Sequence, residues 1–129
     1  MTAVVVDSSV TLKWFIPEVL SEQAERLLDG SFELLTPDLL FPEAGNILWK
    51  KITRGEIQAA EARDVLGALR RVPLVVVASS GLLDGALEIA VAYRRTVYDA
   101  LYLARGVAGI TAYGWRRCQL DAVLARLLT

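Results

Sequence analysis

The sequence predicts an α/β protein of three layers, in which helices cover both faces of a mainly parallel central sheet. Short apolar runs at residues 3–6, 32–36 and 74–77 alternate with longer segments whose apolar residues recur at helical spacing. Strands and helices that alternate in this way are joined by right-handed crossovers, which make neighbouring strands parallel. Hydrophobic residues also make up 54% of the chain, a high fraction that is common when a sheet is covered on both faces.

The elements of the first half are bounded by residues that start or stop helices. After the first strand, the serine pair Ser8-Ser9 is suited to cap a helix that stops before Pro17. A second helix is expected from Ser21, a good N-cap, to a stop at Gly30. After the second strand, Pro42 fits the first turn of a helix that ends near Gly55. Another helix, over residues 62–69, leads to the third strand.

The second half is expected to continue the alternation with shorter strands. Ser79 or Ser80 is suited to cap a helix whose apolar residues lie at positions 83, 86, 87 and 90. The remaining expected elements are a strand at residues 96–97, a helix over 100–105, a weak strand at 109–111 and a final helix over 120–127. No repeat, low-complexity segment or linker interrupts the pattern, so a single domain over residues 1–129 is expected.

The composition excludes several kinds of chemistry. The chain has no histidine, which removes Ser-His-Asp and Cys-His catalysis, histidine ribonucleases and most zinc hydrolases. Hydrolysis would therefore depend on carboxylates, alone or with hard cations such as Mg2+ or Mn2+. The net charge of -1 also argues against a dedicated nucleic-acid-binding module. No apolar run is long enough to span a membrane, and the single cysteine, Cys118, cannot form an internal disulfide, so a cytoplasmic location is expected.

Three acidic residues are placed where a parallel sheet collects functional groups. Asp7 and Asp99 each stand at an expected strand-to-helix transition, and Glu43 opens a helix. Carboxyl ends of strands and N-termini of helices share one edge of such a sheet, so the three acids are expected to converge there. Together they would repel one another unless a divalent cation offset their charge. Each acid taken alone also fits a capping or first-turn role, and position alone does not choose between these interpretations.

Three short motifs resemble those of PIN-domain proteins, and most closely the VapC toxins of prokaryotic toxin-antitoxin modules. They are Asp7-Ser8-Ser9-Val10, Pro42-Glu43-x-x-Asn46-x-Leu48-Trp49 and Tyr98-Asp99-Ala100-Leu101-Tyr102-Leu103-Ala104. The resemblance covers residues 3 to 111 or so and implies a toxin endoribonuclease that uses Mg2+ or Mn2+. It implies that Asp7, Glu43 and Asp99 are the catalytic, metal-binding acids, and that Ser9 and Asn46 are the small polar residues beside the first two. It also implies a homodimer, an RNA substrate and inhibition by a VapB-like antitoxin.

One segment departs from the family pattern. The family usually carries Thr-x-Asp at the end of its last strand, whereas this chain has Thr111-Ala112-Tyr113 and so lacks the fourth acid. Thr111 is kept as a residue that supports the site, and Asp121 is a substitute only if it does not serve as a first-turn residue of the last helix. The departure motivates an alternative, a catalytically impaired PIN domain that acts as a binding or scaffold module.

Cationic and aromatic residues are assigned mostly to structural roles. Lys13 and Arg116 are the expected phosphate contacts, because the basic pairs Lys50-Lys51, Arg70-Arg71 and Arg94-Arg95 lie near expected helix C-termini. Trp14, Phe15 and Trp49 are interpreted as core or dimer contacts rather than as base-stacking platforms. A phosphoacceptor receiver domain is disfavoured, because no second acid accompanies Asp7 at the first strand and no lysine follows Lys51.

Overall fold

A parallel sheet lies at the centre of the molecule. The structure is a computed structural model that describes residues 2–17 and 21–112. Its sheet contains β1 (Thr2–Val5), β2 (Phe32–Pro37) and β3 (Leu74–Val77), with β2 in the middle. Both pairings are parallel, with Val4 opposite Leu34 and Leu34 opposite Leu74. Because both pairings are parallel, the carboxyl ends of the three strands lie at one edge of the sheet. The expected parallel sheet is confirmed.

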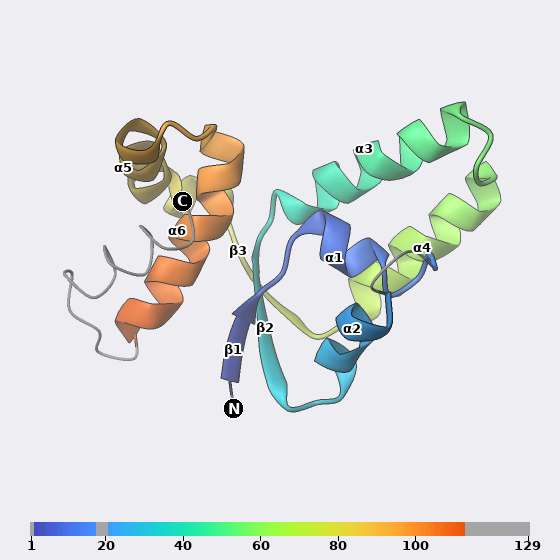
Figure 1. Ribbon diagram of the computed structural model, residues 1–129, viewed down its shortest axis with the longest axis horizontal. Coiled ribbons are helices and arrows are strands. Elements are labelled where there is room, and N and C mark those ends of the chain that lie inside the picture. Colours follow the sequence, from blue (N-terminus) through green and yellow to red (C-terminus); the bar gives the residue numbers. More distant parts are fainter. Residues whose placement is uncertain (1, 18–20, 113–129) are drawn as a thin grey trace.

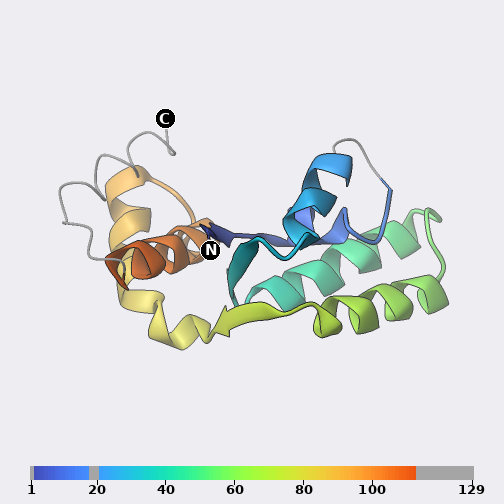
Figure 2. The ribbon, with the colours of Figure 1, turned by 90° about the horizontal axis from the view of Figure 1, so that it is seen from below.

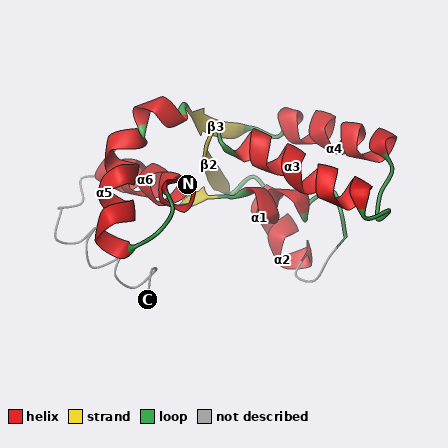
Figure 3. Ribbon diagram, turned by 90° about the horizontal axis from the view of Figure 1, so that it is seen from above, coloured by secondary structure: helices red, strands yellow, loops and turns green. Residues whose placement is uncertain are grey.

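Helices cover both sides of this sheet. Figures 1 and 3 show α5 and α6 on one side and α1 to α4 on the other, and Figure 2 shows α3 and α4 running side by side. The arrangement confirms the three-layer α/β/α architecture. The helical segments are α1 (Ser8–Leu12), α2 (Ser21–Glu25), α3 (Leu40–Thr53), α4 (Ala59–Arg71), α5 (Leu83–Tyr93), α6 (Val97–Ala112) and the short 3-10 turns η1 (Arg26–Leu28) and η2 (Ser79–Gly81).

Each side of the sheet has its own apolar core. Ala86 and Ile89 of α5 pack with Ala100, Leu101 and Ala104 of α6 on one side. On the other side, one cluster joins α1, α3 and α4, and a second gathers β1 and β2 residues around Trp14; their fully buried members include Leu40, Leu48, Leu69 and Val6. No helix in the described part of the chain is long and apolar enough to cross a membrane.

The ends of the first helices largely follow the sequence signals. Gly30 and Gly55 both have positive φ, which glycine adopts without a steric penalty, and they follow η1 and α3 as expected. The capping role considered for Asp7 is confirmed, and the serine cap predicted for α1 is wrong. Its N-cap is Asp7, whose side chain accepts the Val10 N–H, while Ser8 is already the first helical residue. An aspartate is as good an N-cap as a serine, so the helix begins one residue earlier than the serine pair suggested.

The predicted cap of α5 is also wrong. Ser79 begins η2, and the residue before α5 is Leu82, which has no side-chain capping hydrogen bond. Ser79 is instead bonded to Asp38 at the end of β2. A serine that is already engaged across the sheet edge is not free to cap the next helix.

Both short strands expected in the second half are wrong. Val97 and residues 109–111 belong to one continuous helix, α6. The Thr96 hydroxyl accepts the Asp99 N–H at 3.1 Å, so Thr96 starts a helix instead of ending a strand. Gly106 lets α6 approach β1, because a Cβ there would lie 3.3 Å from Cγ2 of Val5. The expected helix over 120–127 lies outside the described residues.

Candidate functional site

Asp7 and Glu43 stand at the carboxyl edge on neighbouring elements. Asp7 follows β1 and is exposed, and its Oδ1 accepts the Ser9 hydroxyl and the Val10 N–H, both at 2.9 Å. Glu43 is half-buried in the first turn of α3, where the positive end of the helix dipole favours a carboxylate. The Ser9 contact agrees with the predicted place of that residue beside the first acid.

Tyr102 of α6 lies near both of these acids. Its hydroxyl donates a hydrogen bond to Oε1 of Glu43, and it is half-buried. The pKa of Tyr102 is raised far above its usual value, first by burial, then by the hydrogen bond to Glu43 and by the negative charges of Glu43 and Asp7. The buried Ser8 side chain faces the same phenol and opposes the rise. Side chains from α1, α3 and α6 therefore converge on one phenol oxygen.

Asp99 lies one turn before Tyr102 on α6, on the same face of the helix. It is exposed, and its N–H is bonded to Thr96. Within residues 2–17 and 21–112, no three His, Cys, Asp or Glu side chains are grouped closely enough to hold a metal ion. The shared site of Asp7, Glu43 and Asp99 therefore remains a prediction.

The chemistry of the acids fits a hard divalent cation. Carboxylate oxygens are the ligands that Mg2+ and Mn2+ prefer. Asp7 and Glu43 place two negative charges near one phenol. A cation held by these carboxylates would offset their repulsion.

Of the other residues predicted to support the site, the structure describes the side chains of some and not of others. Asn46 is exposed on α3, one turn beyond Glu43, and Lys13 is half-buried at the C-terminal end of α1. Thr111 lies within α6 rather than at the end of a strand, which corrects its expected position, and its side chain is outside the described set. Arg116, Tyr113 and Asp121 also lie outside the described residues.

Asp38 is an acid at the same edge that the sequence reasoning missed. It follows β2, and its Oδ1 accepts the Ser79 N–H at 2.9 Å and the Ser79 hydroxyl. These two hydrogen bonds hold the pKa of Asp38 below its usual range, the hydroxyl contributing most. The rule that selected Asp7, an acid directly after a buried strand, would have selected Asp38 as well.

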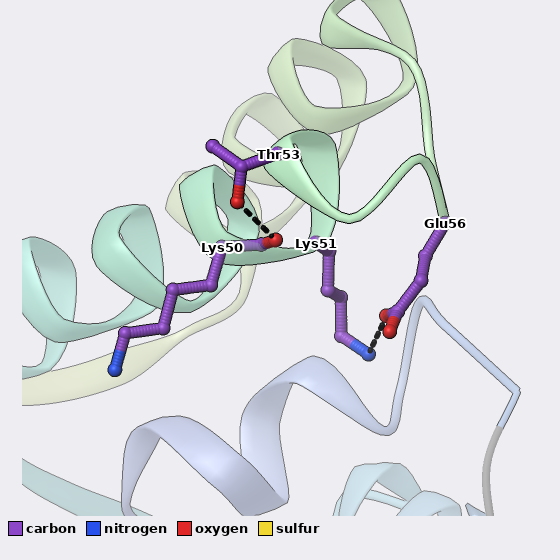
Figure 4. Close-up of polar contacts among 4 residues, drawn as sticks. All are labelled: Lys50, Lys51, Thr53 and Glu56. Carbon is purple, nitrogen blue, oxygen red and sulfur yellow. Dashed lines mark hydrogen bonds and ion pairs between the residues drawn. The ribbon is translucent and has the colours of Figure 1, made fainter.

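The aromatic and basic residues separate into structural and exposed groups. Trp14 is buried, with Nε1 donating to the Ala24 carbonyl at 2.7 Å and an edge-on contact with Phe15, which confirms a core role. Trp49 is 59% exposed, so its assignment to the core is wrong, and a dimer contact stays a prediction. Lys50 and Lys51 lie in the last turn of α3, where Lys51 pairs with Glu56 at 3.4 Å (Figure 4). That position confirms their structural placement.

Comparison with known proteins decides the family. The PIN domain family model matches residues 4–105. The chain belongs to the PIN-domain family. The matched range of the PIN domain includes Asp7, Glu43 and Asp99 as well as Tyr102, and it ends before Thr111. Over 102 residues, the PIN domain is 39% identical to Ribonuclease VapC3 of Pyrobaculum aerophilum, covering 78% of each chain. The predicted resemblance to VapC-like PIN-domain proteins is confirmed.

Proposed function

We propose that this PIN domain is a metal-dependent endoribonuclease and the toxin of a VapBC-type toxin-antitoxin module. The observation that carries the proposal is the convergence of Asp7 and Glu43 on Tyr102, at the edge where α1, α3 and α6 meet. The similarity to Ribonuclease VapC3 supports RNA as the substrate. Because the chain has no histidine, its acid-base and positioning work falls to carboxylates and hydroxyls.

The three acids share the work of metal binding and water activation in this proposal. Asp7 and Asp99 would hold Mg2+ or Mn2+, and Glu43 would bind the metal or orient the attacking water. When bound, the cation lowers the pKa of its water and screens the negative charge of the phosphodiester. Ser9 fixes the Asp7 carboxylate through the hydrogen bond already described, which limits the motion of one ligand. Asn46 and Lys13 supply polar and cationic groups for the RNA next to the acids.

The proposed partners follow from membership in the VapC-like group. We infer a homodimer, a VapB-like antitoxin that inhibits the enzyme, and a cytoplasmic location. A second candidate is a catalytically impaired PIN domain that binds RNA or protein without cleaving. That alternative is favoured by one observation, Tyr113 at the position where the family usually has an aspartate.

The proposal is tested by RNA cleavage. The full chain should cleave single-stranded RNA internally with Mg2+ or Mn2+, and excess EDTA should abolish the cleavage. Asp7→Asn should be inactive in the same assay while its far-UV circular dichroism matches that of the parent. Metal-independent cleavage, or cleavage that survives in Asp7→Asn, would contradict the mechanism. A folded parent that binds RNA and never cleaves it would support the second candidate instead.

A further inference from the structure

Tyr102 occupies a position that core packing alone does not explain. Its phenol oxygen reaches a carboxylate on another helix, and that carboxylate is one of the proposed catalytic acids. Tyr98, one turn earlier on α6, is 64% exposed, and Tyr93 of α5 packs against the α5–α6 core. Among these three tyrosines, hydrogen-bond donation to an acid of the site is described for Tyr102 alone.

The phenol contacts groups from two other elements at once. It donates to Oε1 of Glu43, and the Asp7 carboxylate is near enough to raise its pKa through its negative charge. The Ser8 side chain lies close enough to the phenol to offset a part of the rise in its pKa. A donor in this place fixes one oxygen of Glu43, and a carboxylate has a second oxygen that can bind a ligand.

Fixing a carboxylate has consequences for chemistry. A glutamate side chain has three rotatable bonds, so an unrestrained Glu43 spends part of its time out of position. Hydrogen bonds that orient a ligand from outside the metal sphere typically change metal affinity or activity by about 10- to 100-fold. Removal of a hydroxyl that donates to a charged group changes an equilibrium constant by a similar factor.

We propose that Tyr102 is a positioning residue that holds the Glu43 carboxylate beside Asp7 for the metal and the attacking water. The inference rests on the proposed function for its catalytic part. The geometric part of the inference, the coupling of Tyr102 to Glu43, depends only on the contacts that Tyr102 makes with side chains of α3 and α1. Tyr102 does not touch the reacting atoms and acts through Glu43.

The test removes a single oxygen atom. Tyr102→Phe is compared with Tyr93→Phe, a control that deletes a hydroxyl outside the site. Binding of Mn2+ to the metal-free full chain is measured by calorimetry, and cleavage of single-stranded RNA by steady-state kinetics. We expect Tyr102→Phe to weaken Mn2+ binding about 10-fold and to lower kcat about 10- to 100-fold. KM for RNA should stay within about threefold, and Tyr93→Phe should match the parent in all three quantities.

A double-mutant cycle separates positioning from a general structural role. On a Glu43→Ala background, which lacks the oxygen that accepts the Tyr102 hydroxyl, Tyr102→Phe should change Mn2+ affinity by less than about twofold. An equal loss on both backgrounds overturns the inference. So does a Tyr102→Phe protein that has a lower melting temperature but unchanged Mn2+ affinity and kcat.

The two proposals fail in different ways. If the parent does not cleave RNA but the Mn2+ cycle shows the expected coupling, the ribonuclease proposal fails and the positioning role of Tyr102 is supported. If the parent cleaves RNA and the cycle shows no coupling, the positioning role is overturned and the ribonuclease proposal stands.

Discussion

The ends of β1 and β2 carry the same local chemistry but have different surroundings. Asp7 follows β1, and Asp38 follows β2. In both, Oδ1 accepts one backbone N–H and one serine hydroxyl: Asp7 from Val10 and Ser9, Asp38 from Ser79 alone. Only the Asp7 end, of these two described strand ends, faces the phenol that is bonded to Glu43.

This difference shows that the local geometry of an acid after a strand does not determine whether the acid has a catalytic role. An acid that follows a parallel strand lies at the functional edge and caps the backbone that comes next, whether or not it has a catalytic role. What separates Asp7 from Asp38 is the side chain that lies near each carboxylate. The helix α6 brings Tyr102 toward Asp7, while the Asp38 carboxylate ties β2 to the turn after β3. In our proposal, the same residue type serves the active site at one strand end, whereas at the next it forms a structural clamp, the pair of hydrogen bonds from Ser79 to Asp38.

Replacing each aspartate by asparagine should produce the largest contrast. Asp7→Asn should lower RNA cleavage about 1000-fold or more, the scale seen when one essential catalytic group is lost. Asp38→Asn should leave the rate within about twofold, because its carboxylate is bonded to Ser79 and has no part in the proposed mechanism. Steady-state cleavage of one RNA by both variants makes the measurement. Equal losses in the two variants would show that the two strand ends do not differ in function.

The buried tryptophan beside the β1 end should matter more for stability than the exposed one on α3. Trp14→Ala removes a core side chain and its hydrogen bond to Ala24, so it should cost about 3–5 kcal/mol of unfolding free energy. Trp49→Ala should cost less than about 1 kcal/mol, since that side chain is 59% exposed. Urea unfolding of both variants gives the two values. A large loss for Trp49→Ala would mean that it is covered in solution, as the predicted dimer contact requires.

The clamp at the β2 end should contribute a smaller amount to stability. Asp38→Ala deletes the acceptor for the Ser79 N–H and hydroxyl, and exposed side-chain acceptors for backbone N–H groups contribute about 1 kcal/mol. Asp38→Asn keeps an acceptor oxygen and should lose less than Asp38→Ala. The midpoints of urea unfolding at neutral pH give the comparison. If Asp38→Ala is as stable as the parent, the clamp has no stabilising role.

The smallest expected effect is a change in acid sensitivity. The pKa of Asp38 is lowered in the folded protein by its hydrogen bonds to Ser79, from a usual value of 3.8. The carboxylate therefore stabilises the fold fully above pH 3.8 and loses that contribution as the pH falls through the lower, folded-state pKa. Asp38→Asn should flatten this part of the stability curve. Thermal melts across the acid range compare the two proteins, and parallel curves would contradict the assignment.

The first half of the fold was predictable because its boundaries are encoded locally. Gly30 and Gly55 adopt the positive φ that ends a helical segment, and Pro42 lies in the first turns of α3. The strands between them are long enough to be recognised. In the second half, Thr96-Val97 has strand propensity, yet the threonine hydroxyl caps α6 and the helix continues to Ala112. Gly106 allows α6 to lie close to β1, a tertiary contact that the local sequence signals do not report.

The candidate site was predictable only as a set of acids. The carboxyl-edge rule selected Asp7 and Glu43, whose proximity to one phenol the structure describes. The same rule could not separate Asp7 from Asp38, because the difference depends on α6, which is distant in the sequence. Tyr102 was part of a recognised motif but received no role, since its partner Glu43 lies 59 positions away.

Titration of Mn2+ into the metal-free parent, Asp7→Asn and Asp38→Asn tests most directly whether the β1 end is the metal site. All three proteins keep an oxygen that accepts the local backbone N–H, so each should be folded at neutral pH. Calorimetry should show Mn2+ binding to the parent and to Asp38→Asn with affinities within about twofold, and binding at least about 10-fold weaker to Asp7→Asn. Unchanged affinity in Asp7→Asn, or an equal loss in Asp38→Asn, would contradict the assignment of Asp7 to the metal and of Asp38 to the fold.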